Sequence, residues 1–323
     1  MASSPAVGGG VPGPVHGPAQ THTAPAPAQQ QQQRSALLIS AAELAVSLAS
    51  ATPPIVIELA SPAELEQEPR RIPKSQRVWR PDYQRPADEV GGLDGMVPTM
   101  AAFEAFARAL GIDDSSEVVL VDRRYDATRL WWLFALFGKT TGVRLLDGGF
   151  PAWVAAGHLI TDETPAAPPQ GSWVARAPDA QMLATREEVA MLSAEAKPRL
   201  WDVRTIEEHE GTTTLRGASR PGRIPWASAR VEWGLFRRKD GGWESQQRVT
   251  ELARAVLNAI VGDGQSHTFY CQSGVRTTQL IFGMKLAGWE LSQLRNYDGS
   301  WVEWSHTADE SQIFVPDTPA DSE

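Results

Sequence analysis

Short apolar runs alternate with longer helical patterns along most of the chain. In the first half, runs with the length of buried strands are Ile55–Leu59, Val118–Val121 and Val143–Leu146. In the second half, similar runs are Leu200–Val203, Thr268–Tyr270 and Leu294–Tyr297. Buried parallel strands read as short, nearly continuous apolar runs, and helices usually connect them. The pattern therefore predicts an α/β fold, in which parallel sheets are flanked by helices on both faces.

The two halves of the chain repeat one another. Residues 146–153 read Leu-Asp-Gly-Gly-Phe-Pro-Ala-Trp, and residues 297–304 read Tyr-Asp-Gly-Ser-Trp-Val-Glu-Trp. A strand-like run and a glycine-ended helical run precede each segment, and these helical runs are Ala127–Gly138 and Arg276–Gly288. The same elements in the same order indicate a duplicated α/β unit. The proline-rich stretch 164–178 between the units is predicted to be a linker.

The ends of the chain differ in composition from the two units. The first 33 residues contain no Lys, Arg, Asp or Glu and end in a run of glutamines. Such a segment cannot bury enough apolar surface to order itself. We therefore expect a disordered leader over 1–35, a first domain over 36–163, the linker over 164–178, a second domain over 179–308 and a loose acidic tail over 309–323.

Composition and charge exclude several classes of function. The 323 residues carry a net charge of −9, and the sequence pI is about 5.3, whereas nucleic acid and anionic membranes select a basic face. No apolar run reaches the roughly 18 residues that a membrane-spanning helix needs. A single cysteine permits no internal disulfide and fits a reducing compartment. The leader lacks the basic start of a secretory signal, so we expect a cytoplasmic protein, with a mitochondrion or another organelle as the alternative.

The single cysteine, Cys271, lies where a parallel sheet is expected to bind a ligand. It ends the strand-like run Thr268–Tyr270, and ligands of such sheets bind beyond the carboxyl ends of the strands. A short loop follows, and a helical run begins near Arg276. Gly274 permits a tight turn, and the unpaired N–H groups of a helix start form an anion nest. Such a nest, with Arg276 beside it, should stabilise a thiolate or a persulfide anion.

Two other interpretations of Cys271 compete with a nucleophile. A lone cysteine is often an inert buried residue, although the strand–loop–helix context argues against that interpretation here. Tyrosine-phosphatase loops also place a cysteine before an arginine at a helix start, with one more residue between them. Four residues separate Cys271 from Arg276, which leaves less room for a tetrahedral phosphate and suits a smaller ligand such as a sulfur atom.

Taken together, the motifs resemble the tandem-rhodanese sulfurtransferases, the family of thiosulfate and 3-mercaptopyruvate sulfurtransferases. The resemblance covers about residues 36–306 and depends on Cys-Gln-Ser-Gly-Val-Arg-Thr at 271–277, Asp-Val-Arg at 202–204, Arg-Pro-Gly-Arg-Ile-Pro at 220–225 and Asn-Tyr-Asp-Gly-Ser-Trp at 296–301. It implies two tandem rhodanese-like domains, with a sulfur-loaded cysteine in the second and a catalytically silent first. In agreement, the corresponding loop of the first half has no cysteine.

Several residues around the cysteine are candidates for the site. The loop expected to hold a persulfide consists of Gln272, Ser273, Gly274, Val275, Arg276 and Thr277. Arg220, Arg223 and Arg276 are candidate ligands of an anionic donor, because a guanidinium fork suits carboxylate or sulfonate-like oxygens. A solvated basic loop is the alternative for Arg220 and Arg223. The resemblance implies that Asp202 and Arg204 form a structural ion pair that supports the site. No histidine has a partner at metal-ligand spacing, so we expect no metal and no cofactor.

The sequence departs from the family pattern in ways that affect the choice of sulfur donor. Arg71 and Arg223 stand where the family usually has a histidine. The loop shares Ser273 with enzymes specific for 3-mercaptopyruvate, whereas Gln272 and Arg276 resemble a microbial type labelled thiosulfate sulfurtransferase. Both donors therefore stay open at this point, with thiosulfate as the first expectation.

The predicted reaction is a two-step sulfur transfer through a covalent intermediate. The Cys271 thiolate takes the outer sulfur of a small anionic donor such as thiosulfate. A thiophilic acceptor, which is cyanide or a thiol such as reduced thioredoxin, then removes that sulfur. One alternative is the same mechanism with 3-mercaptopyruvate. Another is a non-catalytic rhodanese module that binds a partner protein, and a third is hydrolysis of an aryl phosphate.

Overall fold

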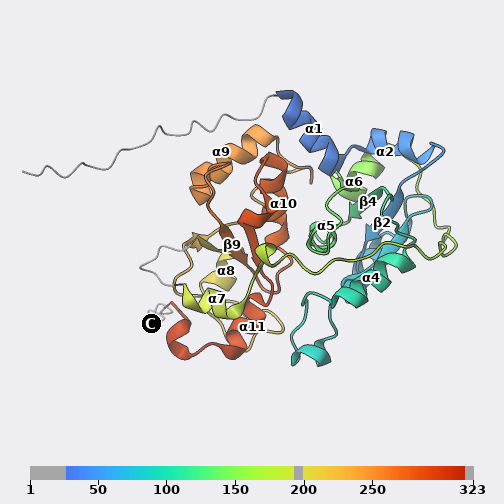
Figure 1. Ribbon diagram of the computed structural model, residues 1–323. Helices are drawn as coiled ribbons and strands as arrows, with labels where there is room; N and C mark the ends of the chain where they lie inside the picture. The colour runs from blue at the N-terminus through green and yellow to red at the C-terminus, as the bar shows by residue number, and fades with distance from the viewer. Residues whose placement is uncertain (1–26, 193–198, 317–323) are drawn as a thin grey trace, which may run out of the picture.

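The computed structural model describes residues 27–192 and 199–316, which form two parallel sheets wrapped by helices (Figure 1). The first sheet contains, in spatial order, β1 (Leu38–Ile39), β5 (Val143–Leu146), β4 (Val118–Asp122), β2 (Ile55–Leu59) and β3 (Gln76–Val78). The second contains, in spatial order, β6 (Leu183–Ala184), β10 (Leu294–Tyr297), β9 (His267–Tyr270), β7 (Leu200–Asp202) and β8 (Ala229–Arg230). The order of crossovers is the same in both sheets, which confirms the predicted α/β fold and its duplication.

Each domain has its own set of helices. Those of the first domain are α2 (Ala41–Leu48), α3 (Pro62–Gln67), α4 (Met100–Ala109), α5 (Ala127–Leu136) and α6 (Gly149–Ala155). Those of the second are α7 (Arg186–Met191), α8 (Ile206–His209), α9 (Gln246–Leu257), α10 (Thr277–Ala287) and α11 (Ser300–Thr307). None of the helices in the described residues is long and apolar enough to cross a membrane.

Helices cover both faces of each sheet. Alternate residues of a strand point to opposite faces, so each strand packs against helices on both sides. In β4, Val118 and Leu120 pack into the cluster around α5, whereas Val119 and Val121 pack into a second cluster against α2 and α6. This burial on both sides explains why the strands read as continuous apolar runs rather than as an alternating pattern.

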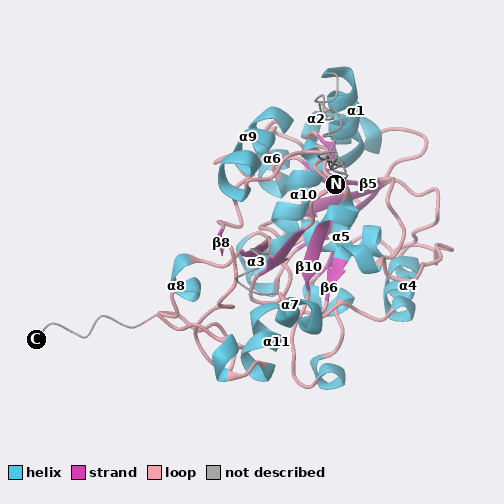
Figure 2. Ribbon diagram, turned by 60° about the vertical axis from the view of Figure 1, so that its left-hand side comes forward, coloured by secondary structure: helices cyan, strands magenta, loops and turns pink. Residues whose placement is uncertain are grey.

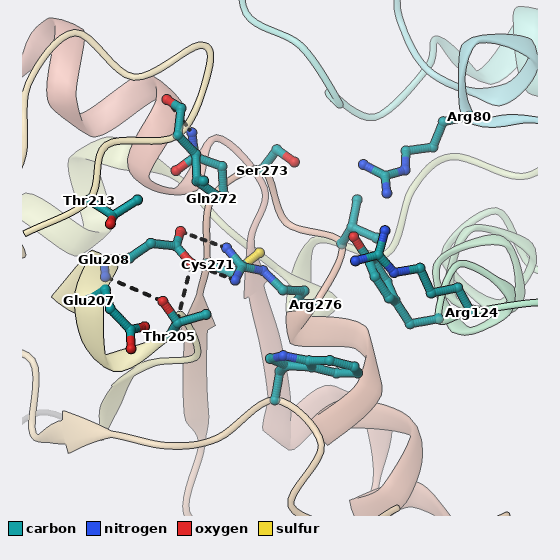
Figure 3. Close-up of a pocket in the computed structure, with 14 residues that line it drawn as sticks. Arg80, Arg124, Thr205, Glu207, Glu208, Thr213, Cys271, Gln272, Ser273 and Arg276 are labelled. Carbon is teal, nitrogen blue, oxygen red and sulfur yellow. Dashed lines mark hydrogen bonds and ion pairs between the residues drawn. The ribbon is translucent and has the colours of Figure 1, made fainter. Parts of the chain in front are cut away.

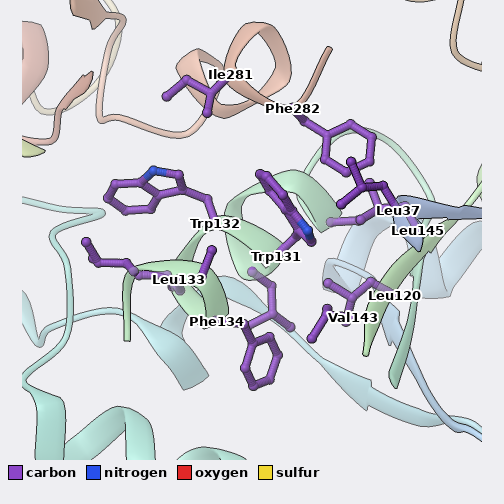
Figure 4. Close-up of a cluster of buried hydrophobic side chains, with 14 of the residues drawn as sticks. Leu37, Leu120, Trp131, Trp132, Leu133, Phe134, Val143, Leu145, Ile281 and Phe282 are labelled. Atoms are coloured by element: carbon purple, nitrogen blue, oxygen red, sulfur yellow. The ribbon is translucent and has the colours of Figure 1, made fainter. Parts of the chain in front are cut away.

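The two domains share one hydrophobic core through α5 and α10, which lie side by side in Figures 1 and 2. Every residue of α5 is buried. Trp131 of α5 meets Phe282 of α10 edge to face, with ring centroids 4.8 Å apart, inside the cluster of Figure 4. Such aromatic pairs bury large areas and prefer this geometry. The shared core therefore fixes the position of the first domain against the second.

The prediction of a disordered leader over 1–35 is wrong from residue 27 onward, because helix α1 (Pro27–Leu37) is part of the fold. Arg34 pairs with Asp147 of the first domain at 2.8 Å. Gln33 donates a hydrogen bond to the carbonyl of Lys285 in the second domain, also at 2.8 Å. The helix therefore joins both domains, through partners far away in the sequence that composition does not reveal. The rest of the expected leader, residues 1–26, lies outside the described residues.

The expected loose tail is also ordered as far as residue 316. Arg223 and Phe314 form an antiparallel bridge, in which both N–O distances are 2.9 Å. A Cβ added to Gly222, which has a φ of +117°, would lie 2.7 Å from the carbonyl oxygen of Phe314. Residues 309–316 therefore close against the second domain, and residues 317–323 lie outside the described part of the chain.

Candidate active site

Cys271 directly follows β9 at the carboxyl edge of the second sheet. Its N–H group donates to Ser300 Oγ at 3.0 Å, and its carbonyl accepts the N–H of Trp301 at 2.9 Å. The residue is 1% exposed, yet it lines an open cavity of about 540 Å³ to which residues of both domains contribute (Figure 3). The thiol therefore lies on the floor of a cavity.

The loop after Cys271 is held in a tight turn that requires glycine. Gly274 has a φ of +67°, and a Cβ at this position would lie 2.8 Å from the carbonyl oxygen of Asp298. Its N–H donates to Ser300 Oγ at 3.0 Å. Its carbonyl accepts Thr277 Oγ1 at 2.7 Å and Asn296 Nδ2 at 2.9 Å. These bonds fix the loop against β10 and the start of α11.

Other backbone amides of the loop are available to a ligand. Within residues 27–192 and 199–316, no acceptor is bonded to the N–H groups of Gln272, Ser273, Val275 and Arg276. The topologically corresponding loop of the first domain follows β4. There, Asp122 Oδ1 accepts the N–H groups of Arg124 at 3.1 Å and Asp126 at 3.0 Å. The first-domain loop thus binds an acidic oxygen, which is the kind of ligand an anion nest selects.

Arg276 stands beside the thiol, as Figure 3 shows, and is held by a carboxylate that sequence analysis did not identify. Glu208 binds its two terminal nitrogens at 2.7 and 2.8 Å. Burial lowers the pKa of Arg276, but the bond to Glu208 and the charge of Cys271 raise it, with a net upward shift. The guanidinium therefore stays charged, and Glu208 compensates much of that charge. A sequence signal for Glu208 is the capping box with Thr205 at the start of α8.

Asp202 and Arg204 form a buried ion pair below the site. Arg204 donates to the two oxygens of Asp202 at 2.9 and 2.7 Å. His209 Nδ1 and the Tyr270 hydroxyl each lie 2.8 Å from Asp202 Oδ2. Burial raises the pKa of Asp202, but Arg204 and His209 lower it, and the net value lies well below the ordinary range. This network ties β7 to β9, and neither member of the pair lines the cavity.

The structure places Arg220 and Arg223, two of the expected donor ligands, outside the lining of the cavity around the cysteine. Arg220 donates to the carbonyl of Ser305 at 2.9 Å and to that of Ala308, at the end of α11. Arg223 donates to the carbonyl of His209 at 3.0 Å. Both guanidinium groups thus bind backbone carbonyls and hold loops of the second domain together.

The first domain supplies cavity cations that sequence analysis missed. Arg80 lies just beyond β3, and its Nε pairs with Asp126 at 2.7 Å. Arg124 follows β4, with its guanidinium 4.9 Å from the centroid of the Tyr125 ring. Arg80, Arg124 and Tyr125 line the cavity, whereas Asp126 does not. Arg124 belongs to the first-domain loop that corresponds to the cysteine loop, and the duplication of the chain is a sequence signal for that correspondence. No local pattern shows that this loop faces the second domain. Among the described residues, no cluster of His, Cys, Asp and Glu is arranged to hold a metal.

Comparisons with known proteins agree with this geometry. Residues 185–307 match the family model described as a rhodanese-like domain. The chain is 30% identical over 251 residues to "Sulfur carrier protein TtuD" of Thermus thermophilus, which covers 73% of this chain and 82% of that protein. It is 28% identical over 263 residues to "3-mercaptopyruvate sulfurtransferase" of Rattus norvegicus, covering 80% and 84%.

A third relative and a solved structure extend the comparison. Identity is 29% over 225 residues to "Thiosulfate sulfurtransferase" of Gallus gallus, covering 68% of this chain and 74% of that protein. The Tum1 protein from Saccharomyces cerevisiae has the same fold, with a TM-score of 0.70 at 20% identity, covering 86% of this chain and 98% of that one. The chain therefore belongs to the rhodanese family of sulfurtransferases, enzymes that transfer sulfur-containing groups.

Proposed function

We propose that the protein moves sulfane sulfur from thiosulfate to a thiophilic acceptor through a persulfide on Cys271. The observation that carries this proposal is the position of Cys271, on the floor of a cavity that also contains arginines. In the first step, the thiolate attacks the outer sulfur of thiosulfate. The sulfur–sulfur bond of the donor breaks, and its electron pair leaves with sulfite. The product is a Cys271 persulfide anion.

The loop supplies the electrostatic environment for this anion. The N–H groups of Gln272, Ser273, Val275 and Arg276 have no acceptor in the described chain, so they can donate to the outer sulfur. They lie at the start of α10, where the helix dipole favours negative charge. Donors that are fixed before the reaction need no reorganisation when charge develops. The first-domain loop supports this role, because its amides already bind Asp122.

The second step returns the free enzyme. Cyanide in an assay, or a thiol such as reduced thioredoxin in a cell, attacks the outer sulfur of the persulfide. The bond between the two sulfurs breaks, and its electron pair stays on Cys271 as a thiolate. Because the donor leaves before the acceptor reacts, we expect ping-pong kinetics. A reducing compartment such as the cytoplasm would keep this lone thiol active.

Thiosulfate is favoured over 3-mercaptopyruvate as the donor because of the groups around Cys271. Sulfite leaves as an anion without protonation, whereas removal of sulfur from 3-mercaptopyruvate leaves an enolate that must accept a proton. The described residues that line the cavity include Arg80, Arg124 and Arg276, which suit a departing anion, and no histidine that would act as an acid.

A cyanide assay with both donors tests the proposal. We expect wild-type protein to produce thiocyanate from thiosulfate with a higher kcat/KM than from 3-mercaptopyruvate, and Cys271→Ser to produce none. Serine nearly preserves the shape of the residue, so circular dichroism of the variant serves as the control for folding. Turnover that survives in Cys271→Ser would refute the assignment of the nucleophile. A higher kcat/KM with 3-mercaptopyruvate would reassign the donor.

A further inference from the structure

The charged groups of the cavity are divided between its two walls. On the second-domain wall, Glu208 holds Arg276 in a bidentate ion pair, which compensates its charge. Glu207 also lines this wall. Hydrogen bonds from its own backbone and from Thr205 lower the pKa of Glu207, so it is ionised at neutral pH. The charged side chains of this wall therefore give an anionic donor little net attraction.

The first-domain wall is cationic and has donors to spare. Arg80 uses its Nε for the ion pair with Asp126, and its terminal nitrogens make no hydrogen bond within the described part of the chain. Its guanidinium is stacked 5.2 Å from the Trp79 ring and 5.8 Å from the Tyr125 ring. Arg124 has no carboxylate partner among the described residues and lies over Tyr125. Figure 3 shows both side chains extending from one side toward the cysteine loop.

We propose that Arg80 and Arg124 recognise the anionic end of the sulfur donor, so that the domain without a cysteine selects the substrate. This inference rests on the proposed sulfur transfer at Cys271. A planar guanidinium matches the oxygens of a sulfonate-like or carboxylate group, and stacking on aromatic rings holds it in place before the donor arrives. Acids on one wall and cations on the other orient the donor, with its oxygens toward the first domain and its outer sulfur toward Cys271.

The position of the two arginines explains how donor recognition depends on both domains. Arg80 and Arg124 reach the cavity because α5 and α10 share one core, which brings the loop after β4 opposite the loop after β9. Tyr125, which also lines the cavity, packs against Trp233 of the second domain with ring centroids 5.2 Å apart and ring planes tilted by 54°. The cationic wall is therefore fixed to the domain that performs the chemistry.

Arg124→Gln tests the inference most cleanly, because Arg124 is exposed and its removal leaves no buried acid unpaired. A hydrogen bond to a charged group contributes enough that its loss should raise KM for thiosulfate about tenfold or more. Arg124→Lys keeps the positive charge, so its KM for thiosulfate should lie between those of wild type and Arg124→Gln. High salt should reduce this advantage over Arg124→Gln, because salt screens the attraction between the lysine and the donor. The matched control is Arg248→Gln, an exposed arginine on α9 outside the cavity, which should leave KM unchanged.

A second readout separates donor recognition from the chemistry of the thiol. Attack of the Cys271 thiolate on an uncharged dialkyl trisulfide breaks one sulfur–sulfur bond, releases an alkyl thiolate or alkyl persulfide and leaves a mixed disulfide or trisulfide on Cys271. Intact-mass spectrometry should show this gain in mass at the wild-type rate in Arg124→Gln. Arg80→Lys should behave like Arg124→Lys with thiosulfate. An Arg124→Gln variant whose KM matches that of Arg248→Gln would overturn the inference, and so would an equal loss with both donors. Wild-type protein that takes up sulfur from neither donor would instead overturn the proposed function itself.

Discussion

Replacing Arg129 by methionine is expected to destabilise the protein and to displace the cysteine loop. Arg129 belongs to α5 of the first domain and is 2% exposed. Its Nη1 pairs with Asp298 Oδ1 at 2.7 Å and donates to the carbonyl of Gly274 at 3.2 Å. Its Nη2 donates to the carbonyl of Gly95 at 2.8 Å. One buried guanidinium therefore joins the first domain to the turn that shapes the site.

The size of the effect follows from the groups that would lose their partner. Removing one member of a buried ion pair typically costs about 3–5 kcal/mol, because the other charge stays buried. Asp298 keeps the N–H of Val97 at 2.7 Å, and its side chain is 14% exposed. The carbonyl of Gly274 keeps two other donors. We therefore expect a loss near the lower end of that range, about 3 kcal/mol in the free energy of unfolding.

Urea unfolding of wild type, Arg129→Met and Asp298→Asn, together with the double variant, measures this contribution. The double-variant cycle should return a coupling energy of at least about 1 kcal/mol between Arg129 and Asp298. Turnover with thiosulfate, measured where Arg129→Met is still folded, should fall because the loop amides lose their position. A loss of stability below about 1 kcal/mol with unchanged turnover would refute the idea that this guanidinium holds the cysteine loop.

Three further predictions address other parts of the structure. Gly274→Ala should lower stability by about 1–3 kcal/mol in thermal unfolding, because its φ is +67° and its Cβ would meet Asp298; unchanged stability would contradict the strained turn. Glu208→Gln should lower kcat about tenfold while the far-ultraviolet spectrum stays the same, because Arg276 loses its carboxylate; an unchanged kcat would contradict its positioning role. Burial raises the pKa of Asp122 to about 7, so the native state holds its proton more tightly than the unfolded chain does, and stability should fall as pH rises from about 4 to 7. Asp122→Asn should reduce this slope in urea unfolding at several pH values, and an identical slope would contradict the assignment.

The fold could be predicted to a large extent because its signals are local. Runs such as Val118–Val121 are apolar throughout, since both sides of each strand are buried. The duplication was readable from the repeated Asp-Gly segments that follow β5 and β10. Local patterns failed where order comes from distant partners. Nothing near Arg34 in the sequence indicates its ion pair with Asp147, so the sequence alone predicts a disordered leader where α1 forms.

The candidate site was predictable on the side of the second domain and hidden on the other side. Gly274 and Arg276 lie in the short loop after Cys271, and that loop has the turn expected of it. For Arg220 and Arg223, a basic loop in the sequence does not show that backbone carbonyls already bind the guanidinium groups. The cations of the opposite wall depend on how two domains pack, which motif spacing within either domain does not encode.

The most direct test of the account is the intact mass of the protein after treatment with thiosulfate. We predict that wild-type protein gains one sulfur atom, that peptide mapping places it on Cys271, and that cyanide removes it with formation of thiocyanate. Cys271→Ser should gain nothing under the same conditions. A wild-type mass that does not change, while the thiol still reacts with an alkylating agent, would contradict the claim that this cysteine carries sulfur.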